Sequence, residues 1–279
     1  MSTYGKTGAE GAPVCPRHPG VVTYVRCQRC GRPTCPACQR TAPVGIHCVD
    51  CVSKGASAVR QKRTSGGALA VERAPIVTYL IIGIAALVTL LQQVIPTLTS
   101  DLMFVPVFAT QEPWRFLTSM FAHGGIWHIA LNGYALYLVG PPLERVLGHA
   151  RFLALVLLSA FGGSVAVLLL ASPSNLSWVT GVVGASGAVF GLFAALAITM
   201  RRLKRSDSQL LVLIGINLVI GFVVAGVSWQ AHIGGLLTGA ALAAAYLYTP
   251  RKHMALMAWA APLVIAAALI ALTLIGANG

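Results

Sequence analysis

Ser186 and His232 are the residues of this chain whose types and surroundings most directly suggest chemistry. Ser186 stands in the segment GASG (184–187) and His232 in the segment AHIGG (231–235), each near the beginning of a long apolar run. Polar reactive side chains are costly inside a bilayer, so a nucleophile and a base kept there indicate a function. The pair predicts the cleavage of peptide bonds within the membrane.

The composition is that of an integral membrane protein. Hydrophobic residues make up 56% of the 279 residues, and charged residues make up only 10%. Seven apolar runs are near the ~20 residues that a helix needs to cross the hydrocarbon layer. Their hydrophobicity is continuous instead of alternating, so we expect helices and no β-barrel. The runs are Ile76–Ile95, Phe116–Val139, Phe152–Ala171, Val182–Met200, Leu210–Val227, Ala231–Tyr248 and Met254–Ile275.

The charged residues predict how the chain crosses the membrane. Lys and Arg gather before the first run, between the second and third, after the fourth and after the sixth. Cytoplasmic loops carry an excess of these residues, so the amino terminus is expected inside and the carboxyl terminus outside. We expect a multi-pass protein of the cell membrane, in a bacterial cytoplasmic membrane. The net charge of +13 then reflects topology and a basic amino-terminal domain, and nucleic-acid binding is not expected.

All seven cysteines lie near the amino terminus, and with one histidine they form four pairs separated by two residues. Such spacing lets one turn present both side chains to a tetrahedral ion, and eight ligands suffice for two closed zinc sites. An odd cysteine count and a cytoplasmic location disfavour disulfides, and a redox dithiol does not need four pairs. We expect two structural zinc ions, with one ion or another metal as the alternatives. The pairs are Cys15 and His18, Cys27 and Cys30, Cys35 and Cys38, and Cys48 and Cys51.

The pattern resembles B-box-like, cross-brace zinc fingers, in which the first and third pairs share one ion and the second and fourth share the other. A domain at 1–54 has too little core to fold alone, so metal is expected to stabilise it. A basic linker rich in Ser and Gly follows at 55–74. A cytoplasmic protein partner for this domain is a further expectation. The resemblance assigns Cys15, His18, Cys35 and Cys38 to one zinc ion, and Cys27, Cys30, Cys48 and Cys51 to the second.

The predicted topology brings several polar residues to one depth. The second, fourth and sixth runs enter from the outer side, and a rise of 1.5 Å per residue places Ser186 about 6–10 Å below the start of its helix. His128 and Asn132 share one helix face at i and i+4 and could donate hydrogen bonds to an oxyanion. No carboxylate lies in the middle of a run, which favours a Ser–His dyad over a triad. The glycines expected to let two helices approach closely are Gly187 and Gly191 on one and Gly235 and Gly239 on the other.

Together these motifs resemble the rhomboid family of intramembrane serine proteases, over about Ile76 to Tyr248. Four signatures occur in order: EPWR at 112–115, His123 followed by His128 and Asn132, GASG at 184–187, and AHIGGLLTG at 231–239. The resemblance implies an all-α membrane protein with a six-helix catalytic core at 75–250. A seventh transmembrane helix at 251–279 and the small cytoplasmic zinc finger would be additions to that core.

The resemblance also implies roles for individual residues. Ser186 would be the nucleophile and His232 the base, with no cofactor needed for catalysis. His128, Asn132 and the backbone amide of Ser186 would form the oxyanion hole. Trp114 and Arg115 would belong to the membrane-embedded outer loop, where Glu112 and Arg115 are structural. Phe190 departs from the tyrosine of several members, but its ring can still stack on His232.

The expected substrates are transmembrane segments of membrane proteins, cleaved near the outer face of the lipid bilayer. A catalytically silent rhomboid-like protein that binds membrane clients is the first alternative, and the complete set of site residues argues against it. A transporter or proton channel is the second, but it would normally carry paired charges through the bilayer.

Overall fold

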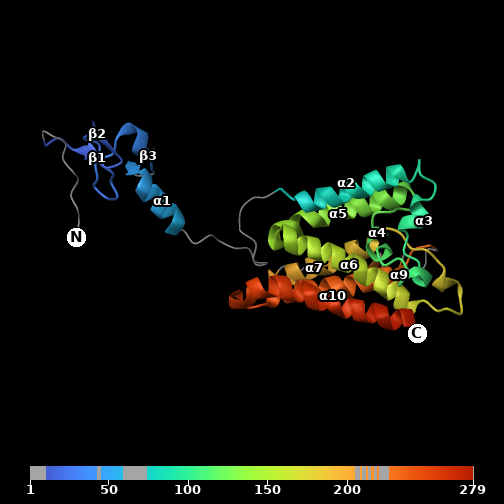
Figure 1. Ribbon diagram of the computed structural model, residues 1–279. Helices are drawn as coiled ribbons and strands as arrows, with labels where there is room; N and C mark the ends of the chain where they lie inside the picture. The colour runs from blue at the N-terminus through green and yellow to red at the C-terminus, as the bar shows by residue number, and fades with distance from the viewer. Residues whose placement is uncertain are drawn as a thin grey trace. The chain divides into compact units, whose positions relative to one another are not determined.

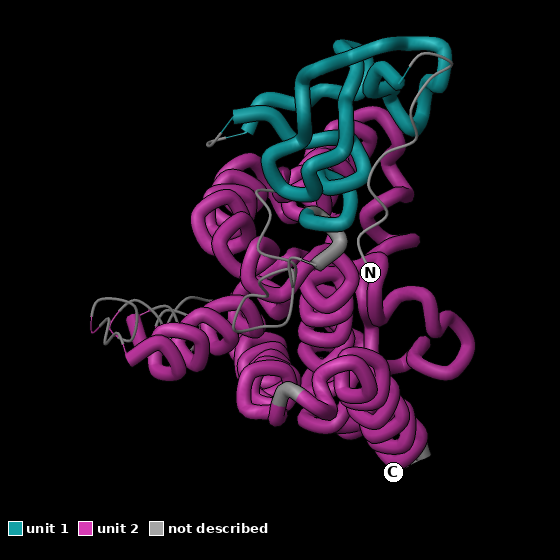
Figure 2. The backbone as a smooth tube through the Cα atoms, turned by 90° about the vertical axis from the view of Figure 1, so that its left-hand side faces the viewer, with its two compact units in different colours: residues 1–62 teal, residues 63–279 magenta. Residues whose placement is uncertain are grey.

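The computed structural model describes residues 11–42, 45–58, 74–204 and 226–278, with single positions at 208, 212, 215, 216 and 219. The chain divides into two compact units, residues 1–62 and 63–279 (Figure 2). Each unit has its own core. Most of the predicted linker and most of the predicted run 210–227 lie outside the described residues.

The amino-terminal unit is built from two short antiparallel hairpins and one helix (Figure 1). Six of its seven cysteines are buried, and among its described residues Val14 is the other buried hydrophobic side chain. Its core therefore consists largely of the candidate metal ligands. The elements are β1 (Val14–Cys15), β2 (His18–Val22), η1 (Pro36–Cys38), β3 (Gln39–Thr41), β4 (Ile46–Cys48) and α1 (Val49–Ala58). Because α1 continues to Ala58, residues 55–58 are helical instead of belonging to the linker.

The second unit is a bundle of long apolar helices that lie side by side in Figure 1. At its centre α6, α7 and α9 pack on one another; α5 packs on α2 and α7, and α10 packs on α6 and α9. The long helices are α2 (Ile76–Leu91), α5 (Ile126–Leu147), α6 (His149–Leu170), α7 (Ser186–Arg202), α9 (Trp229–Tyr248) and α10 (Met254–Asn278). Short elements between them are α3 (Leu98–Leu102), η2 (Pro106–Phe108), α4 (Arg115–Thr118), η3 (Leu176–Trp178) and η4 (Arg251–His253).

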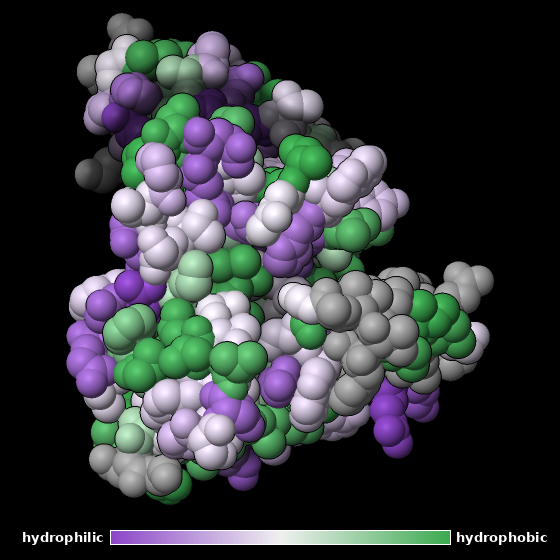
Figure 3. Space-filling view, turned by 90° about the vertical axis from the view of Figure 1, so that its right-hand side faces the viewer, coloured by the Kyte–Doolittle hydropathy of each residue, from purple (hydrophilic) through white to green (hydrophobic). Residues whose placement is uncertain are grey.

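The surface of this bundle suits a lipid environment. Among the described helices, α6, α9 and α10 are long and apolar enough to cross a membrane, and α2 is a shorter apolar helix. Many large hydrophobic side chains are exposed on the helices, and Figure 3 shows such residues in green on one face. An exposed apolar surface of this extent is stable in contact with lipid. The all-α membrane fold expected from the sequence is confirmed.

Two helices begin later than their apolar runs, which corrects the predicted boundaries. The run predicted from Phe116 is interrupted after α4, and α5 begins only at Ile126, behind Gly125 with φ 150°. The run predicted from Val182 becomes helical only at Ser186, because Gly184 has φ 115°. Left-handed backbone of this kind cannot belong to an α-helix and favours glycine. Ser186 is therefore the first residue of α7, and the prediction that it lies 6–10 Å inside its helix was wrong.

A buried carboxylate fastens α2 to the rest of the bundle. Glu144 of α5 is 2% exposed, and its carboxylate accepts hydrogen bonds from the backbone N–H groups of Val77 and Thr78, both at 2.9 Å. It also accepts one from the hydroxyl of Thr78 at 2.6 Å and contacts Nδ1 of His149 at 2.5 Å. The first N–H groups of a helix have no partner within that helix. Glu144 thus caps α2 from another helix.

Candidate active site and metal sites

Ser186 is positioned by the loop that precedes it. Phe104 and Val182 form a two-way backbone bridge, with N···O distances of 3.0 and 2.8 Å, and the N–H of Gly184 donates to the carbonyl of Ser119 at 2.9 Å. The hydrogen bond from Val189 to the carbonyl of Ala185 closes the first turn of α7. The N–H of Ser186 precedes that turn, at the positive end of the helix. Ser186 itself is only half-buried, so its side chain is partly accessible.

His232 lies in the first turn of α9, where Ser228 caps the helix by accepting a hydrogen bond from the N–H of Ala231 at 3.4 Å. Its ring is buried and stacks on Phe190, with ring centroids 4.1 Å apart and planes 13° apart. Phe190 follows Ser186 by one turn, so both residues share one face of α7. His232 therefore lies on the face of α7 that begins with Ser186.

Nδ1 of His232 has no hydrogen-bond partner among the residues that the structure describes. In a triad, a carboxylate accepts a hydrogen bond from this nitrogen and orients the ring. Here the ring is held by its stacking on Phe190 and by the packing of α9. Among the described residues, therefore, no carboxylate orients the ring of His232.

Glycines bring α7 and α9 into backbone contact. A Cβ atom added at Gly235 would lie 1.9 Å from the carbonyl oxygen of Gly187, and one added at Gly239 would lie 2.4 Å from Cα of Gly191. Both distances are far below van der Waals contact, so no larger residue fits without movement of the helices. These contacts lie one and two turns beyond His232 along α9. They set the distance between the two helices that carry the serine and the histidine.

His128 lies against the same loop. Its Nδ1 accepts a hydrogen bond from the N–H of Gly124 at 3.3 Å, so in the neutral ring the proton is on Nε2. A Cβ atom added at Gly184 would lie 2.5 Å from that Nε2. A donor N–H therefore sits beside the residues that lead into Ser186. Asn132, which is buried, donates one N–H of its amide to the carbonyl of His128 at 3.0 Å and has a second N–H to offer.

The EPWR segment at 112–115 stabilises the loop in which it lies. The guanidinium of Arg115, which is 7% exposed, pairs with the carboxylate of Glu112 and donates to the carbonyls of Ser100 and, at 2.9 Å, of Met103. It therefore fixes the segment around α3 to α4. Trp114 is 54% exposed, and no hydrogen bond joins its side chain to this network among the described residues.

Three contributions were missed by sequence reasoning. Gly184 supplies both the left-handed turn before Ser186 and the space for the His128 ring. Gly162 and Gly234 bring α6 against α9, since a Cβ atom at Gly234 would lie 2.3 Å from the carbonyl oxygen of Gly162. Glu144 caps α2 as described above. The signal available for the first was the glycine that precedes the serine by two residues; the partners of the others are distant in sequence.

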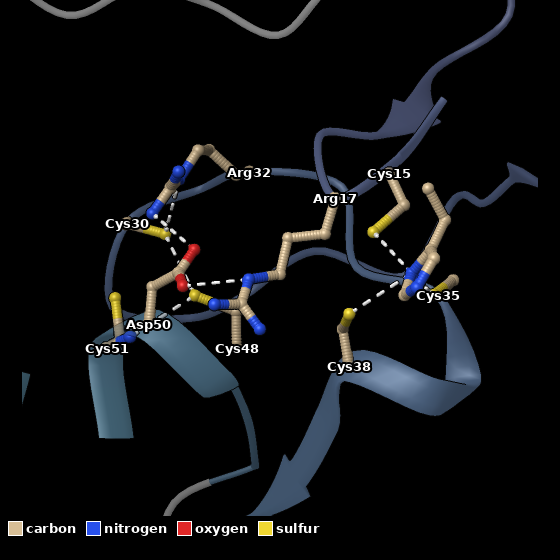
Figure 4. A network of polar contacts seen from close by, with 10 residues as sticks. Cys15, Arg17, Cys30, Arg32, Cys35, Cys38, Cys48, Asp50 and Cys51 are labelled. Atoms are coloured by element: carbon tan, nitrogen blue, oxygen red, sulfur yellow. Dashed lines mark hydrogen bonds and ion pairs between the residues drawn. The ribbon is translucent and has the colours of Figure 1, made fainter. Parts of the chain in front are cut away.

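The amino-terminal unit contains two clusters with the composition of zinc sites. Figure 4 shows three cysteines of each, Cys15, Cys35 and Cys38 in one and Cys30, Cys48 and Cys51 in the other. In each cluster the four ligand atoms lie within 4.8 Å of one another. Nδ1 of His18 is 3.9, 3.2 and 3.4 Å from the sulfurs of Cys15, Cys35 and Cys38. Tetrahedral zinc with ordinary bond lengths separates nitrogen and sulfur ligands by about 3.6 Å. The geometry therefore fits zinc. The clusters are Cys15, His18, Cys35 and Cys38, and Cys27, Cys30, Cys48 and Cys51, which is the pairing that the B-box resemblance implies.

Electrostatics also favours a cation in these clusters. Burial opposes the charged form of Cys15, but backbone hydrogen bonds from Cys35 and Arg17 lower the pKa of its thiol to about 6. Burial and the neighbouring sulfurs instead raise the pKa of Cys38 to about 11. Neighbouring thiolates repel one another, so a cation between them is needed before all of them ionise. Outside the clusters, the carboxylate of Asp50 pairs with Arg17 at 3.1 Å and with Arg32 at 3.4 Å (Figure 4).

Comparison with known proteins gives the family. A family model described as the Rhomboid domain matches residues 110–249, which is half of the chain. The chain belongs to the rhomboid family. The match includes all of the candidate active-site residues and does not extend to the amino-terminal clusters, so the zinc-finger-like unit is an addition to the rhomboid domain.

Relatives in bacteria and plants support the assignment. The chain is 39% identical over 145 residues to the rhomboid protease GluP of Bacillus subtilis, covering 50% of this chain and 27% of that protein. It is 37% identical over 148 residues to RHOMBOID-like protein 6, mitochondrial, of Arabidopsis thaliana, covering 50% and 46%. It is 32% identical over 167 residues to the rhomboid protease AarA of Providencia stuartii, covering 51% and 59%. The matches thus span between a quarter and three-fifths of these relatives.

Proposed function

We propose that this rhomboid protein is an intramembrane serine endopeptidase that cleaves transmembrane segments of other membrane proteins. The observation that carries the proposal is the stacking of His232 on Phe190, on the face of α7 that begins with Ser186. The membership in the rhomboid family and the names of relatives such as GluP and AarA support a protease.

In the proposed mechanism, Ser186 and His232 form the catalytic dyad. Nε2 of His232 accepts the hydroxyl proton of Ser186 as Oγ attacks the carbonyl carbon of the scissile bond. The peptide C–N bond then breaks, and the imidazolium returns its proton to the leaving amine. Water, deprotonated by the same imidazole, attacks the acyl-enzyme and releases the carboxyl product and free Ser186.

The negative charge that develops on the carbonyl oxygen needs donors that are already in place. The N–H of Ser186 at the start of α7, Nε2–H of His128 and the second amide N–H of Asn132 are the candidates. These donors are already held in place: the N–H of Ser186 by the end of the helix, the ring of His128 by its contact with Gly124, and the amide of Asn132 by its bond within α5. Little reorganisation is therefore needed when the charge develops. Substrate helices must unwind to expose a carbonyl, so we expect preferred substrates to carry Gly, Pro or small residues near the cleavage site.

We also propose the topology and the role of the metal sites. The basic loops support a cytoplasmic amino terminus and an outer carboxyl terminus, with cleavage near the outer face of the cell membrane, in a bacterial cytoplasmic membrane. The two clusters would hold structural zinc ions, which supply folding free energy to a unit with little other core. The domain would be positioned to bind a cytoplasmic protein partner. The proposed domains are the zinc-binding domain, the linker, the catalytic core at 75–250 and the carboxyl-terminal helix at 251–279, with the linker now beginning after Ala58.

The test is cleavage of a reporter with one transmembrane segment by purified protein in liposomes. Ser186→Ala and His232→Ala should each abolish cleavage while leaving the protein folded in detergent, because either change removes the activated nucleophile. A fluorophosphonate probe should label Ser186 in the unaltered protein only. Normal turnover by either variant would refute the dyad. A folded, unaltered protein that neither cleaves nor reacts with the probe would instead be a silent family member that binds membrane clients.

A further inference from the structure

The amino-terminal unit exposes a strip of apolar side chains, Val21, Val22, Tyr24 and Val25, which we call the Val21–Val25 strip. Tyr24 is 76% exposed and Val22 is 53% exposed. Thr23 between them is buried, and it is anchored by hydrogen bonds from its N–H to Pro13 and from its hydroxyl to Thr34. Side chains of an extended chain alternate, so Thr23 facing inward makes Val22 and Tyr24 project outward together. Val21 and Val25 alternate with them and are less exposed, at 42% and 41%, so Val22 and Tyr24 are the outward-facing centre of the strip.

Basic side chains flank the strip. Arg26 follows it directly, and its backbone pairs with Pro33 across a turn that also carries Arg29 and Arg32. The described residues of this unit include six Lys and Arg and one carboxylate, Asp50. Two zinc–thiolate clusters would together carry about three negative charges, but the cysteines are mostly buried. The described part of this unit therefore keeps a small net positive charge, although Arg17 and Arg32 pair with Asp50, and Arg26 lies next to the strip in the chain.

We propose that the Val21–Val25 strip and its arginines dock the amino-terminal unit onto an anionic lipid surface. Tyrosine favours the interface between water and lipid, and basic side chains bind anionic headgroups. An apolar element together with a basic one is the combination that gives stable surface attachment. An acidic peptide would match the charge as well, but it would not explain the exposed valines and tyrosine.

The short connection between the two units favours such docking. Residues 59–73 join α1 to the segment before α2, and this stretch spans at most about 55 Å when fully extended. The unit therefore stays near the bilayer that the apolar helices enter, and its effective concentration at the lipid surface is high. The stretch itself carries Arg60, Lys62, Arg63 and Arg73 against Glu72. This inference does not depend on the protease activity proposed above.

The experiment uses the full-length chain in lipid nanodiscs. Tyr24 is replaced by the photoreactive p-benzoyl-phenylalanine, and in a matched control Val52, which is 41% exposed on α1, is replaced in the same way. After irradiation, lipid adducts are quantified by mass spectrometry in phosphatidylcholine alone and with increasing phosphatidylglycerol. Zinc content and melting temperature verify that both labelled chains remain folded.

The probe at position 24 should give lipid adducts that increase with the anionic fraction and decrease at high salt, whereas the probe at position 52 should give few. Adding Arg26→Gln should lower the ratio of docked to free unit about fivefold, the contribution of one basic side chain near an anionic surface. Equal adduct yields at the two positions, or yields independent of phosphatidylglycerol, would overturn the proposal. So would a probe at position 24 that, in native membranes, attaches to a protein in place of lipid.

Discussion

Gly235→Ala is the substitution that most directly tests how packing supports the candidate dyad. The added methyl group would lie 1.9 Å from the carbonyl oxygen of Gly187. Ordinary contact begins at 3.4 Å, so α7 and α9 must separate by about 1.5 Å, and a 1 Å misplacement of catalytic groups can cost about 100-fold in rate. His232 lies one turn from Gly235 and moves with that part of α9. We therefore expect turnover to fall by about 100-fold or more.

The same substitution should also lower the stability of the fold. Overpacking of this kind typically lowers the free energy of unfolding by about 1–3 kcal/mol. Gly133→Ala is a matched control, because Gly133 lies within α5 and a Cβ atom there meets nothing within 4 Å. That change should be neutral or stabilising by up to about 1 kcal/mol, the helix-propensity difference between Gly and Ala. The control therefore separates the effect of the contact from the effect of the residue type.

The assay measures the melting temperature and the cleavage of a transmembrane reporter on the same preparation of each variant. The rate of fluorophosphonate labelling reports on Ser186 without a substrate. If Gly235→Ala melts at a lower temperature but its folded molecules keep full turnover, the helix contact does not position the dyad. If it matches Gly133→Ala in both measurements, the close approach of α7 and α9 is itself wrong.

Three further predictions follow from the sites described. Purified protein should contain about two zinc ions per chain by elemental analysis, and Cys35→Ser should lower that content while sparing the helical unit; metal-free reduced protein would refute this. Glu144→Gln should lower the free energy of unfolding in detergent by about 1–3 kcal/mol, because an amide group would face buried donors, and an unchanged melting temperature would contradict the cap. Asn132→Ala should lower turnover about 100- to 1,000-fold with little change in substrate binding, whereas a destabilised but fully active variant would remove Asn132 from the oxyanion donors.

The sequence predicted the long apolar helices that the structure describes, because continuous hydrophobicity is a local signal. The runs that became α2, α6, α9 and α10 are present close to their predicted bounds. The starts of α5 and α7 were not predictable from hydrophobicity, because they depend on left-handed backbone at Gly125 and Gly184 in otherwise apolar segments. Hydrophobicity measures burial in lipid and is insensitive to backbone dihedral angles.

The cap on α2 illustrates a different limit. Glu144 and Val77 are 67 residues apart in the chain, and their hydrogen bond arises only when α2 packs on α5. No local pattern distinguishes such a carboxylate from one in a solvated loop. The clusters of cysteine and histidine were predictable for the opposite reason, because each pair of ligands lies within one turn.

Because no carboxylate lies next to His232 among the described residues, we expect helix packing to be important for the proposed dyad. In a triad, a charged hydrogen bond holds the imidazole and would restore its orientation after a small displacement. Nδ1 of His232 has no such partner, and stacking on Phe190 fixes the plane of the ring without fixing its rotation within that plane. The position of Nε2 relative to Ser186 is then set by how closely α9 approaches α7. The contact of Gly235 with Gly187 sets that approach, so in the proposed dyad we expect glycine packing to perform the orienting task that a triad gives to an aspartate.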